Sequence, residues 1–115
     1  MKFFLKVLIL FYSSVAPALT DESGYSFKSI DGGTLDISAY QGKAVLVANT
    51  ASRCGFTSQY SNLEKLHRNY KDKGLVVIAV PSNDFNQELS SNSKVKEFCN
   101  ISFDLTLPMT EITSI

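Results

Sequence analysis

Cys54 is the residue of this sequence whose type and setting most clearly suggest chemistry. It lies in the run Ser52-Arg53-Cys54-Gly55-Phe56, which follows an apolar segment and precedes a helical pattern expected to start near Thr57 or Ser58. The free N–H groups and the dipole at the start of a helix favour an anion, so a thiol here is expected to ionise below its reference pKa of about 8.5. The alternative is that Cys54 is a small buried residue without reactivity.

The residue three positions after Cys54 indicates which reaction suits this thiol. A dithiol–disulfide oxidoreductase needs Cys-x-x-Cys, so that the second thiol resolves a mixed disulfide, but residue 57 is threonine. A thiolate without a local partner suits a small electrophile such as a hydroperoxide, whose O–O bond it cleaves while becoming a sulfenic acid.

Cys99, the second of the two cysteines, is the one candidate to resolve such a sulfenic acid. It lies on another predicted helix, so local unwinding is needed before the two sulfurs reach disulfide geometry. Two alternatives remain open: a permanent structural disulfide with Cys54, or a buried, inert thiol on the helix face that it shares with Val95 and Phe98.

The elements around Cys54 form a predicted strand–helix–strand unit. Residues 44–48 and 75–80 are continuous apolar runs, which predict strands buried on both faces. Between them, Tyr60, Leu63, Leu66 or His67, and Tyr70 recur at helical spacing, and Gly74 marks a stop. This pattern predicts parallel strands, with the Cys54 turn and the polar loop 82–91 as neighbours at the carboxyl edge of the sheet.

Shorter elements flank this unit. Residues 25–30 and 34–37 are β-like runs joined by Asp31-Gly32-Gly33, which predicts a hairpin. Residues 93–99 predict a short helix, and residues 105–109 form a weak apolar segment. His67, the one histidine, is expected on the surface rather than as a general base.

Length and charge limit the function further. The chain has 115 residues and equal numbers of acidic and basic residues, so one domain and no electrostatic preference for nucleic acid are expected. Asp84 and Glu88 are too few to propose a metal site, and no cofactor is expected.

The N-terminus has the pattern of a secretory signal peptide over residues 1–18. Lys2 and Lys6 precede an apolar run at 7–12, and Ala16-Pro17-Ala18 is an A-x-A cleavage pattern. The alternative is an uncleaved anchor. We therefore expect an exported, periplasmic or secreted protein with a linker over 19–26, a domain over 27–115 and no stable membrane association after cleavage.

Two motifs resemble the signatures of the glutathione peroxidase family in its cysteine-containing form. The first runs from Asn49 to Thr57 and continues with Gln59-Tyr60 and Leu63. The second comprises Gly74-Leu75-Val76-Val77, Val80-Pro81-Ser82-Asn83-Asp84-Phe85 and Gln87-Glu88, with Phe98-Cys99 and Leu107-Pro108-Met109 following. The resemblance covers about residues 27–109 and implies a thioredoxin-like α/β fold.

The resemblance also implies roles for individual residues. Cys54 would be the peroxidatic cysteine, and Gln87 would belong to the family's catalytic tetrad, where an amide N–H can stabilise a developing anion without adding a charge. Cys99 matches the resolving cysteine of the thioredoxin-dependent members, which implies a thioredoxin-like protein or another thiol as the reductant.

The sequence departs from the family pattern at several points. Ser82 replaces a cysteine that many members carry, and Asp84 and Leu89 replace a common glutamine and a common proline. The tetrad's tryptophan and asparagine come from a Trp-Asn-Phe motif, and this chain contains no tryptophan. We therefore expect a fold that is incomplete at its C-terminus, with an unpaired edge on the central strands.

Taken together, the sequence predicts a thiol peroxidase that reduces hydrogen peroxide or organic hydroperoxides in the response to oxidative stress, through a sulfenic acid and an intramolecular disulfide. The alternatives are a thiol–disulfide exchange protein, or a non-catalytic truncated remnant or redox-responsive binding protein.

Overall fold

The computed structural model describes residues 24–115, so the predicted signal peptide and residues 19–23 of the predicted linker lie outside the described residues. The elements follow one another as β1 (Ser26–Lys28), β2 (Thr34–Asp36), η1 (Ile37–Tyr40), β3 (Ala44–Thr50), α1 (Gln59–Tyr70), η2 (Lys71–Lys73), β4 (Leu75–Pro81) and α2 (Asn92–Phe103). Within this part of the chain, no helix has both the length and the apolar composition needed to cross a membrane.

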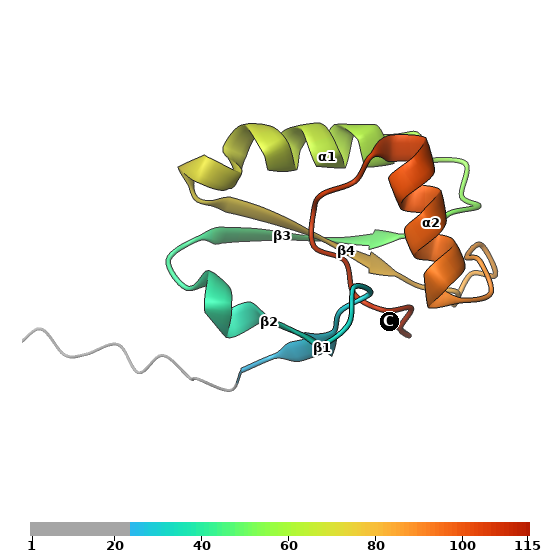
Figure 1. Cartoon of the computed structure of the whole chain (residues 1–115), viewed down its shortest axis with the longest axis horizontal. Coiled ribbons are helices and arrows are strands. Elements are labelled where there is room, and N and C mark those ends of the chain that lie inside the picture. Colours follow the sequence, from blue (N-terminus) through green and yellow to red (C-terminus); the bar gives the residue numbers. More distant parts are fainter. Residues whose placement is uncertain (1–23) are drawn as a thin grey trace, which may run out of the picture.

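The predicted strand–helix–strand unit is confirmed. β3 and β4 pair in parallel, with Ala44 opposite Leu75 and Thr50 opposite Pro81, and α1 connects them. In Figure 1, α1 lies above the two strands, while β1, β2 and η1 lie below them. The Cys54 turn therefore lies at the carboxyl edge of β3, beside the start of the loop that follows β4.

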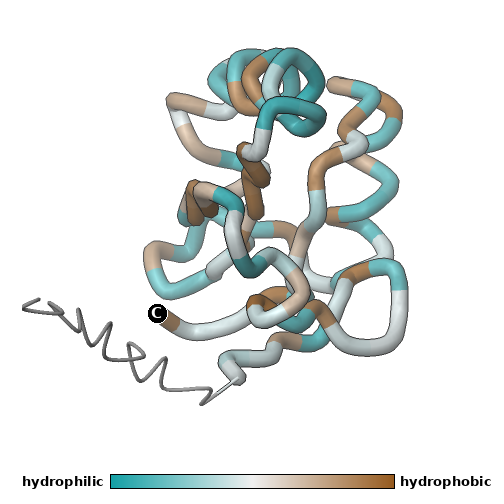
Figure 2. Tube along the Cα trace, turned by 90° about the vertical axis from the view of Figure 1, so that its left-hand side faces the viewer, coloured by the Kyte–Doolittle hydropathy of each residue, from teal (hydrophilic) through white to brown (hydrophobic). Residues whose placement is uncertain are grey.

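β4 is the centre of the hydrophobic core, as its continuous apolar run predicts. Val77 and Ala79 pack with residues of both helices, while Val76, Ile78 and Val80 pack on the opposite face against Leu35 of the hairpin. Figure 2 shows hydrophobic segments gathered in the middle of the molecule, below α1 seen end-on. A strand covered on both faces needs apolar side chains at every position, which explains the run.

The predicted burial of residues 44–48 on both faces is wrong for β3. Leu46 is 39% exposed and Val47 is 57% exposed. These side chains are exposed because β3 pairs with β4 along only one edge and because α1 packs mainly over β4. Among the described residues, the other edge of β3 is unpaired, as the sequence predicts for the central strands.

The hairpin of β1 and β2 is also confirmed. The strands are antiparallel, with Ser26 opposite Asp36. Gly32 and Gly33 in the connection have φ of 92° and 75°, values that L side chains rarely adopt. Glycine has no side chain and adopts such φ values readily, which is why the two adjacent glycines predicted the turn.

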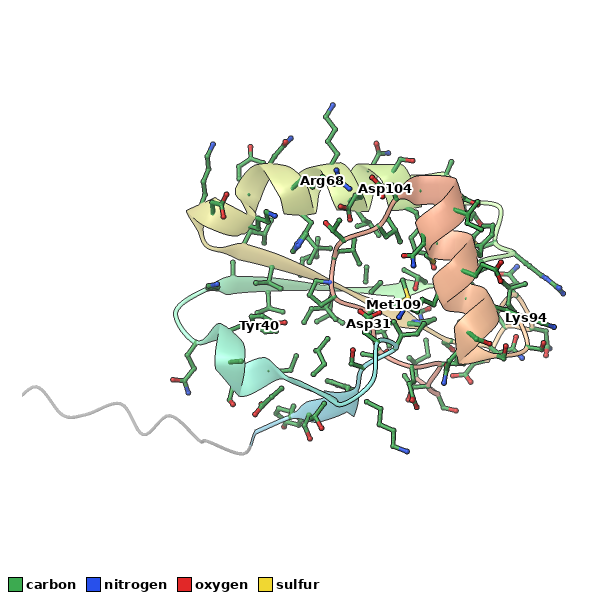
Figure 3. The ribbon with its side chains drawn as sticks, in the orientation of Figure 1. Asp31, Tyr40, Arg68, Lys94, Asp104 and Met109 are labelled. Atoms are coloured by element: carbon green, nitrogen blue, oxygen red, sulfur yellow. The ribbon has the colours of Figure 1, made fainter. Side chains whose placement is uncertain are left out.

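The weak apolar segment at 105–109 has a larger part in the fold than the sequence indicates. The N–H of Ala79 donates to the Pro108 carbonyl (2.9 Å), and the N–H of Thr110 donates to the Ala79 carbonyl (3.0 Å). On its other side, the N–H of Ile30 donates to the Met109 carbonyl (3.0 Å). The segment therefore joins β4 to the hairpin, and Met109 points into the interior (Figure 3).

Helix α2 is longer than the predicted 93–99. Ser91 begins it by accepting a hydrogen bond from the N–H of Lys94, and Asp104 ends it in the left-handed conformation with φ of 49°. The last turn is held by Phe103, whose ring packs against Tyr60 and Phe98 with centroid distances of 5.3 and 5.7 Å. Those tertiary contacts are not visible in the local sequence pattern.

Two predictions for α1 are corrected. Tyr70, expected in the buried stripe, is 46% exposed, because it lies in the last turn, where α1 gives way to η2. His67, expected on the surface, is buried, and its Nδ1 accepts a hydrogen bond from the N–H of Val77 (3.4 Å).

Candidate active site

Cys54 lies in the turn that connects β3 to α1. The helix itself begins at Gln59, and successive backbone hydrogen bonds, from Thr57 to the Cys54 carbonyl (3.1 Å) and from Gln59 to the Phe56 carbonyl (2.9 Å), lead from the cysteine into it. The Cys54 side chain is half-buried, and its Sγ accepts a hydrogen bond from the N–H of Phe56 (3.3 Å). This hydrogen bond holds the sulfur in a fixed position at the start of the turn.

Thr57 holds this turn together from inside. Its hydroxyl donates to the carbonyl of Cys54 and lies 3.4 Å from the carbonyls of Ala51 and Ser52. Thr57 stands where a Cys-x-x-Cys protein has its second thiol, and here it supplies a hydroxyl that binds the backbone. The local geometry thus fixes the position of Cys54 without offering it a neighbouring sulfur.

A pocket of about 150 Å³ opens beside Cys54. Its walls come from the end of β3, the cysteine turn and the first turns of α1; they are Ala48, Asn49, Thr50, Ala51, Cys54, Phe56, Thr57, Gln59, Tyr60 and Leu63. Phe56 at its rim is 71% exposed. Since one water molecule occupies about 30 Å³ in the liquid, the pocket has room for a small group of a few heavy atoms.

The loop 82–91 packs against the cysteine turn, as the sequence predicts. The N–H of Ser82 donates to the Thr50 carbonyl (3.1 Å), and the N–H of Arg53 donates to the Gln87 carbonyl (2.8 Å). Gln87 thus lies beside the residue that precedes Cys54. Its side chain is exposed and is not among the residues that line the pocket, so its part in a tetrad stays a prediction.

Glu88 is the site residue that the sequence pattern did not single out as functional. It is 5% exposed, and its Oε1 accepts hydrogen bonds from the N–H groups of Ser52 (3.0 Å) and Leu89 (2.7 Å). A buried carboxylate thereby ties the cysteine turn to the loop after β4. Its position next to Gln87 in the second motif was the available signal, but a loop glutamate is usually exposed.

Cys99 lies on α2 and is 1% exposed. It packs in the same core cluster as Tyr60 and Val95. Burial raises the pKa of the Cys99 thiol to about 11, with a smaller contribution in the same direction from the charge of Glu88. Cys54 and Cys99 are both free thiols here, and the local unwinding expected before a bond between them stays a prediction.

The fold and the position of Cys54 define a protein of the thioredoxin-like α/β class. Solved structures agree: a thioredoxin-family thiol:disulfide interchange protein from Chlorobium tepidum superposes with a TM-score of 0.66 at 16% identity, covering 79% of this chain and 58% of that one. The structure of T. cruzi GPX1 superposes with a TM-score of 0.53 at 28% identity, covering 75% of this chain and 50% of that one.

Sequence comparison then gives the family. The family model described as glutathione peroxidase matches residues 23–115, so the chain belongs to the glutathione peroxidase family. A glutathione peroxidase of Lactococcus lactis is 44% identical over 88 residues, which are 74% of this chain and 56% of the relative. The glutathione peroxidase-like peroxiredoxin gpx1 of Schizosaccharomyces pombe is 45% identical over 83 residues, 71% of this chain and 52% of the relative.

A third relative is named for a particular substrate. The hydroperoxy fatty acid reductase gpx1 of a Synechocystis species is 37% identical over 89 residues, which cover 76% of this chain and 53% of the relative. The chain spans about half the length of these three relatives.

Proposed function

We propose that this chain carries the peroxidatic half of a thiol peroxidase, with Cys54 as the nucleophile. The observation that supports this most directly is the geometry of Cys54, which is half-buried beside a small pocket and has the N–H of Phe56 directed at its sulfur. Family membership supports the same reaction, since relatives are named glutathione peroxidase and glutathione peroxidase-like peroxiredoxin.

In the first step, the Cys54 thiolate attacks one oxygen of a hydroperoxide. An S–O bond forms, the O–O bond breaks, and the leaving alkoxide or hydroxide takes a proton to become an alcohol or water. Cys54 is oxidised to a sulfenic acid and the hydroperoxide is reduced. Gln87 supplies an amide near this site in our proposal, supported by the contact between its carbonyl and Arg53.

In the second step, Cys99 attacks the sulfenic sulfur and water leaves, which gives a Cys54–Cys99 disulfide. A dithiol protein of the thioredoxin kind then reduces the disulfide. The match to peroxiredoxin-like relatives supports a thiol reductant of this type. Fatty acid hydroperoxides fit as substrates beside hydrogen peroxide, because the exposed Phe56 provides an apolar rim to the pocket.

The test is hydroperoxide consumption by the full chain, coupled to thioredoxin and its reductase. Replacement Cys54→Ser is expected to reduce turnover to the uncatalysed background, because the hydroxyl cannot form a sulfenic acid. Replacement Cys99→Ser should leave the first turnover intact and stop the following ones. A Cys54→Ser chain as active as the parent would refute the proposal.

We also propose export by a signal peptide over residues 1–18, and a role in the response to oxidative stress. The sequence pattern at the N-terminus supports export. Determination of the first residue of the protein purified from its native source tests it, with residue 19 as the expected start; a protein that retains residues 1–18 contradicts it.

A further inference from the structure

The cysteine turn and the loop after β4 are joined next to Cys54 by two neighbouring hydrogen bonds. The N–H of Arg53 donates to the Gln87 carbonyl (2.8 Å), a contact between backbone groups. The N–H of Ser52 donates to Glu88 Oε1 (3.0 Å), so the second contact depends on a side chain. A substitution at Glu88 therefore removes one of these contacts and keeps the residues that make the other.

The Glu88 side chain is itself held from several sides. Its Oε1 also accepts the N–H of Leu89 (2.7 Å), and the N–H of Glu88 donates to Asn83 Oδ1 (3.0 Å). The residue is 5% exposed. A residue that is buried and bonded through both its backbone and its carboxylate has little freedom to move, so it fixes the position of the Ser52 N–H.

The second oxygen of this carboxylate indicates that the arrangement is costly. Oε2 of Glu88 is buried and has no hydrogen-bond partner among the described residues, and the same is true of Ser52 Oγ. Buried polar groups are nearly always paired, and an unpaired one in a folded protein needs an explanation. Stability alone does not favour a buried carboxylate with an unpaired oxygen, whereas a role at the adjacent Cys54 explains it.

The contact with Glu88 lies before the sulfur in the turn, because Ser52 precedes Cys54 by two residues. After the sulfur, the N–H of Phe56 donates to Sγ (3.3 Å), and the Thr57 hydroxyl donates to the Cys54 carbonyl. Phe56 and Thr57 belong to the turn itself, whereas Glu88 comes from another element. Glu88 therefore sets where the turn lies relative to the loop after β4.

We propose that Glu88 is a positioning residue, which holds Cys54 at a fixed place relative to the pocket and to Gln87. This inference rests on the proposed function, since the reaction concerned is the attack of Cys54 on a hydroperoxide. Glu88 acts through the backbone of Ser52 and does not touch the substrate. Misplacement of a reacting atom by about 1 Å slows a reaction by up to about 100-fold, so loss of this contact should slow the oxidation of Cys54.

The experiment measures the first oxidation of Cys54 in chains that carry Cys99→Ser, so that this thiol cannot resolve the sulfenic acid. The chain with Glu88 intact is the reference. Each chain is mixed with hydrogen peroxide, the remaining thiol is trapped by alkylation at intervals, and intact mass gives the rate constant. Glu88→Ala is expected to lower this rate constant by about 10- to 100-fold.

Two conservative variants separate the position of the acceptor oxygen from the charge. Glu88→Gln has the same length and keeps an oxygen for the N–H groups of Ser52 and Leu89, so it should restore most of the rate. Glu88→Asp keeps the charge but is one methylene shorter, so it should remain slow. Glu88→Asp also provides the test if the Glu88→Ala chain does not fold.

Glu64→Ala is the matched control for a loss of stability. Glu64 is also a buried carboxylate that accepts two backbone N–H groups, but these belong to Thr106 and Leu107 and not to the cysteine turn. Urea unfolding of each chain defines conditions in which all of them are folded, and the rates are compared there. Glu64→Ala is expected to lose stability and still to oxidise Cys54 at the reference rate.

A second readout needs no peroxide. Hydrogen exchange followed by mass spectrometry measures the protection of the amides in residues 52–57. Glu88→Ala should speed exchange in this segment and leave exchange in β4 unchanged, and Glu64→Ala should leave the segment as it is in the reference.

Folded Glu88→Ala and Glu88→Asp chains that oxidise Cys54 as fast as the reference would overturn the inference. Equal slowing in Glu64→Ala would also overturn it, because the effect would then be one of stability. A Glu88→Gln chain as slow as Glu88→Ala contradicts the role of the acceptor oxygen. The two proposals fail separately: a reference chain that peroxide does not oxidise contradicts the peroxidase, and hydrogen exchange still tests whether Glu88 holds the turn.

Discussion

The turn that contains Cys54 is held by a backbone N–H and by the side chains of Thr57 and Glu88. The N–H of Phe56 donates to the Cys54 sulfur, the Thr57 hydroxyl donates to the Cys54 carbonyl, and the Glu88 carboxylate accepts the N–H of Ser52. Cys54 is therefore held in place by the turn and still borders the pocket, where a small oxidant can reach it. Replacement of the second cysteine of a Cys-x-x-Cys pair by Thr57 turns a potential resolving group into part of that rigid turn.

His67 provides a prediction about acidity. Burial lowers the pKa of its imidazole below the usual 6.5, and its Nδ1 accepts the N–H of Val77, which a protonated nitrogen cannot do. The unfolded chain therefore binds the proton more readily than the folded one. The contribution of His67 to stability is present above pH 6.5 and is lost as the pH falls through the lowered pKa.

Chemical denaturation at a series of pH values measures this effect. The free energy of unfolding of the parent should decrease below pH 6.5, and the His67→Gln chain, which has no group that titrates there, should show a flatter profile. Equal slopes for parent and variant in this range contradict the assignment.

At the scale of elements, the helix α1 anchors the segment before Met109 through one carboxylate. Glu64 is buried; its Oε2 accepts the N–H groups of Thr106 (2.9 Å) and Leu107 (3.1 Å), and its Oε1 accepts the Thr106 hydroxyl and the Arg68 Nε. Arg68 also pairs with Asp104 at 3.1 Å (Figure 3). Burial alone would raise the pKa of Glu64, but the hydrogen bonds, that of Arg68 first, outweigh it and hold this pKa below its usual value.

Replacement Glu64→Ala should therefore destabilise the fold. It leaves the N–H groups of Thr106 and Leu107 without their acceptor, at a cost of about 1–3 kcal/mol for each one that stays buried. The free energy of unfolding in urea measures the loss, with Glu97→Ala on the exposed side of α2 as the control. A change no larger than that of the control contradicts this role for Glu64.

The elements also show what the sequence could predict. The apolar runs of β3 and β4, the glycine pair of the hairpin and the stop at Gly74 are local signals, and each marked a real boundary. The exposure of Val47, the burial of His67 and Glu64, and the sheet position of residues 108–110 depend on contacts between distant segments. No periodicity within one element contains that information.

In the candidate site, too, the local features could be predicted from the sequence and the contacts between distant segments could not. The motif around Cys54 located the turn, and the strand order located the loop that contains Gln87 beside it. Glu88 was missed because its burial depends on Ser52, 36 residues earlier in the chain.

At the scale of the whole molecule, the described residues form the βαβ unit and hairpin of a thioredoxin-like fold, and the chain spans about half the length of its curated relatives. The described residues include both thiols and the pocket beside Cys54. The proposed two-step thiol chemistry at Cys54 and Cys99 would need a hydroperoxide as the oxidant and an external dithiol as the reductant.

One measurement tests this account most directly: the intact mass of the full chain before and after one equivalent of hydroperoxide. The account predicts loss of two hydrogens and a Cys54–Cys99 linkage in peptide mapping, while the Cys99→Ser chain gains one oxygen at Cys54. An unchanged mass of the parent after peroxide, with Cys54 still free to alkylate, would contradict it.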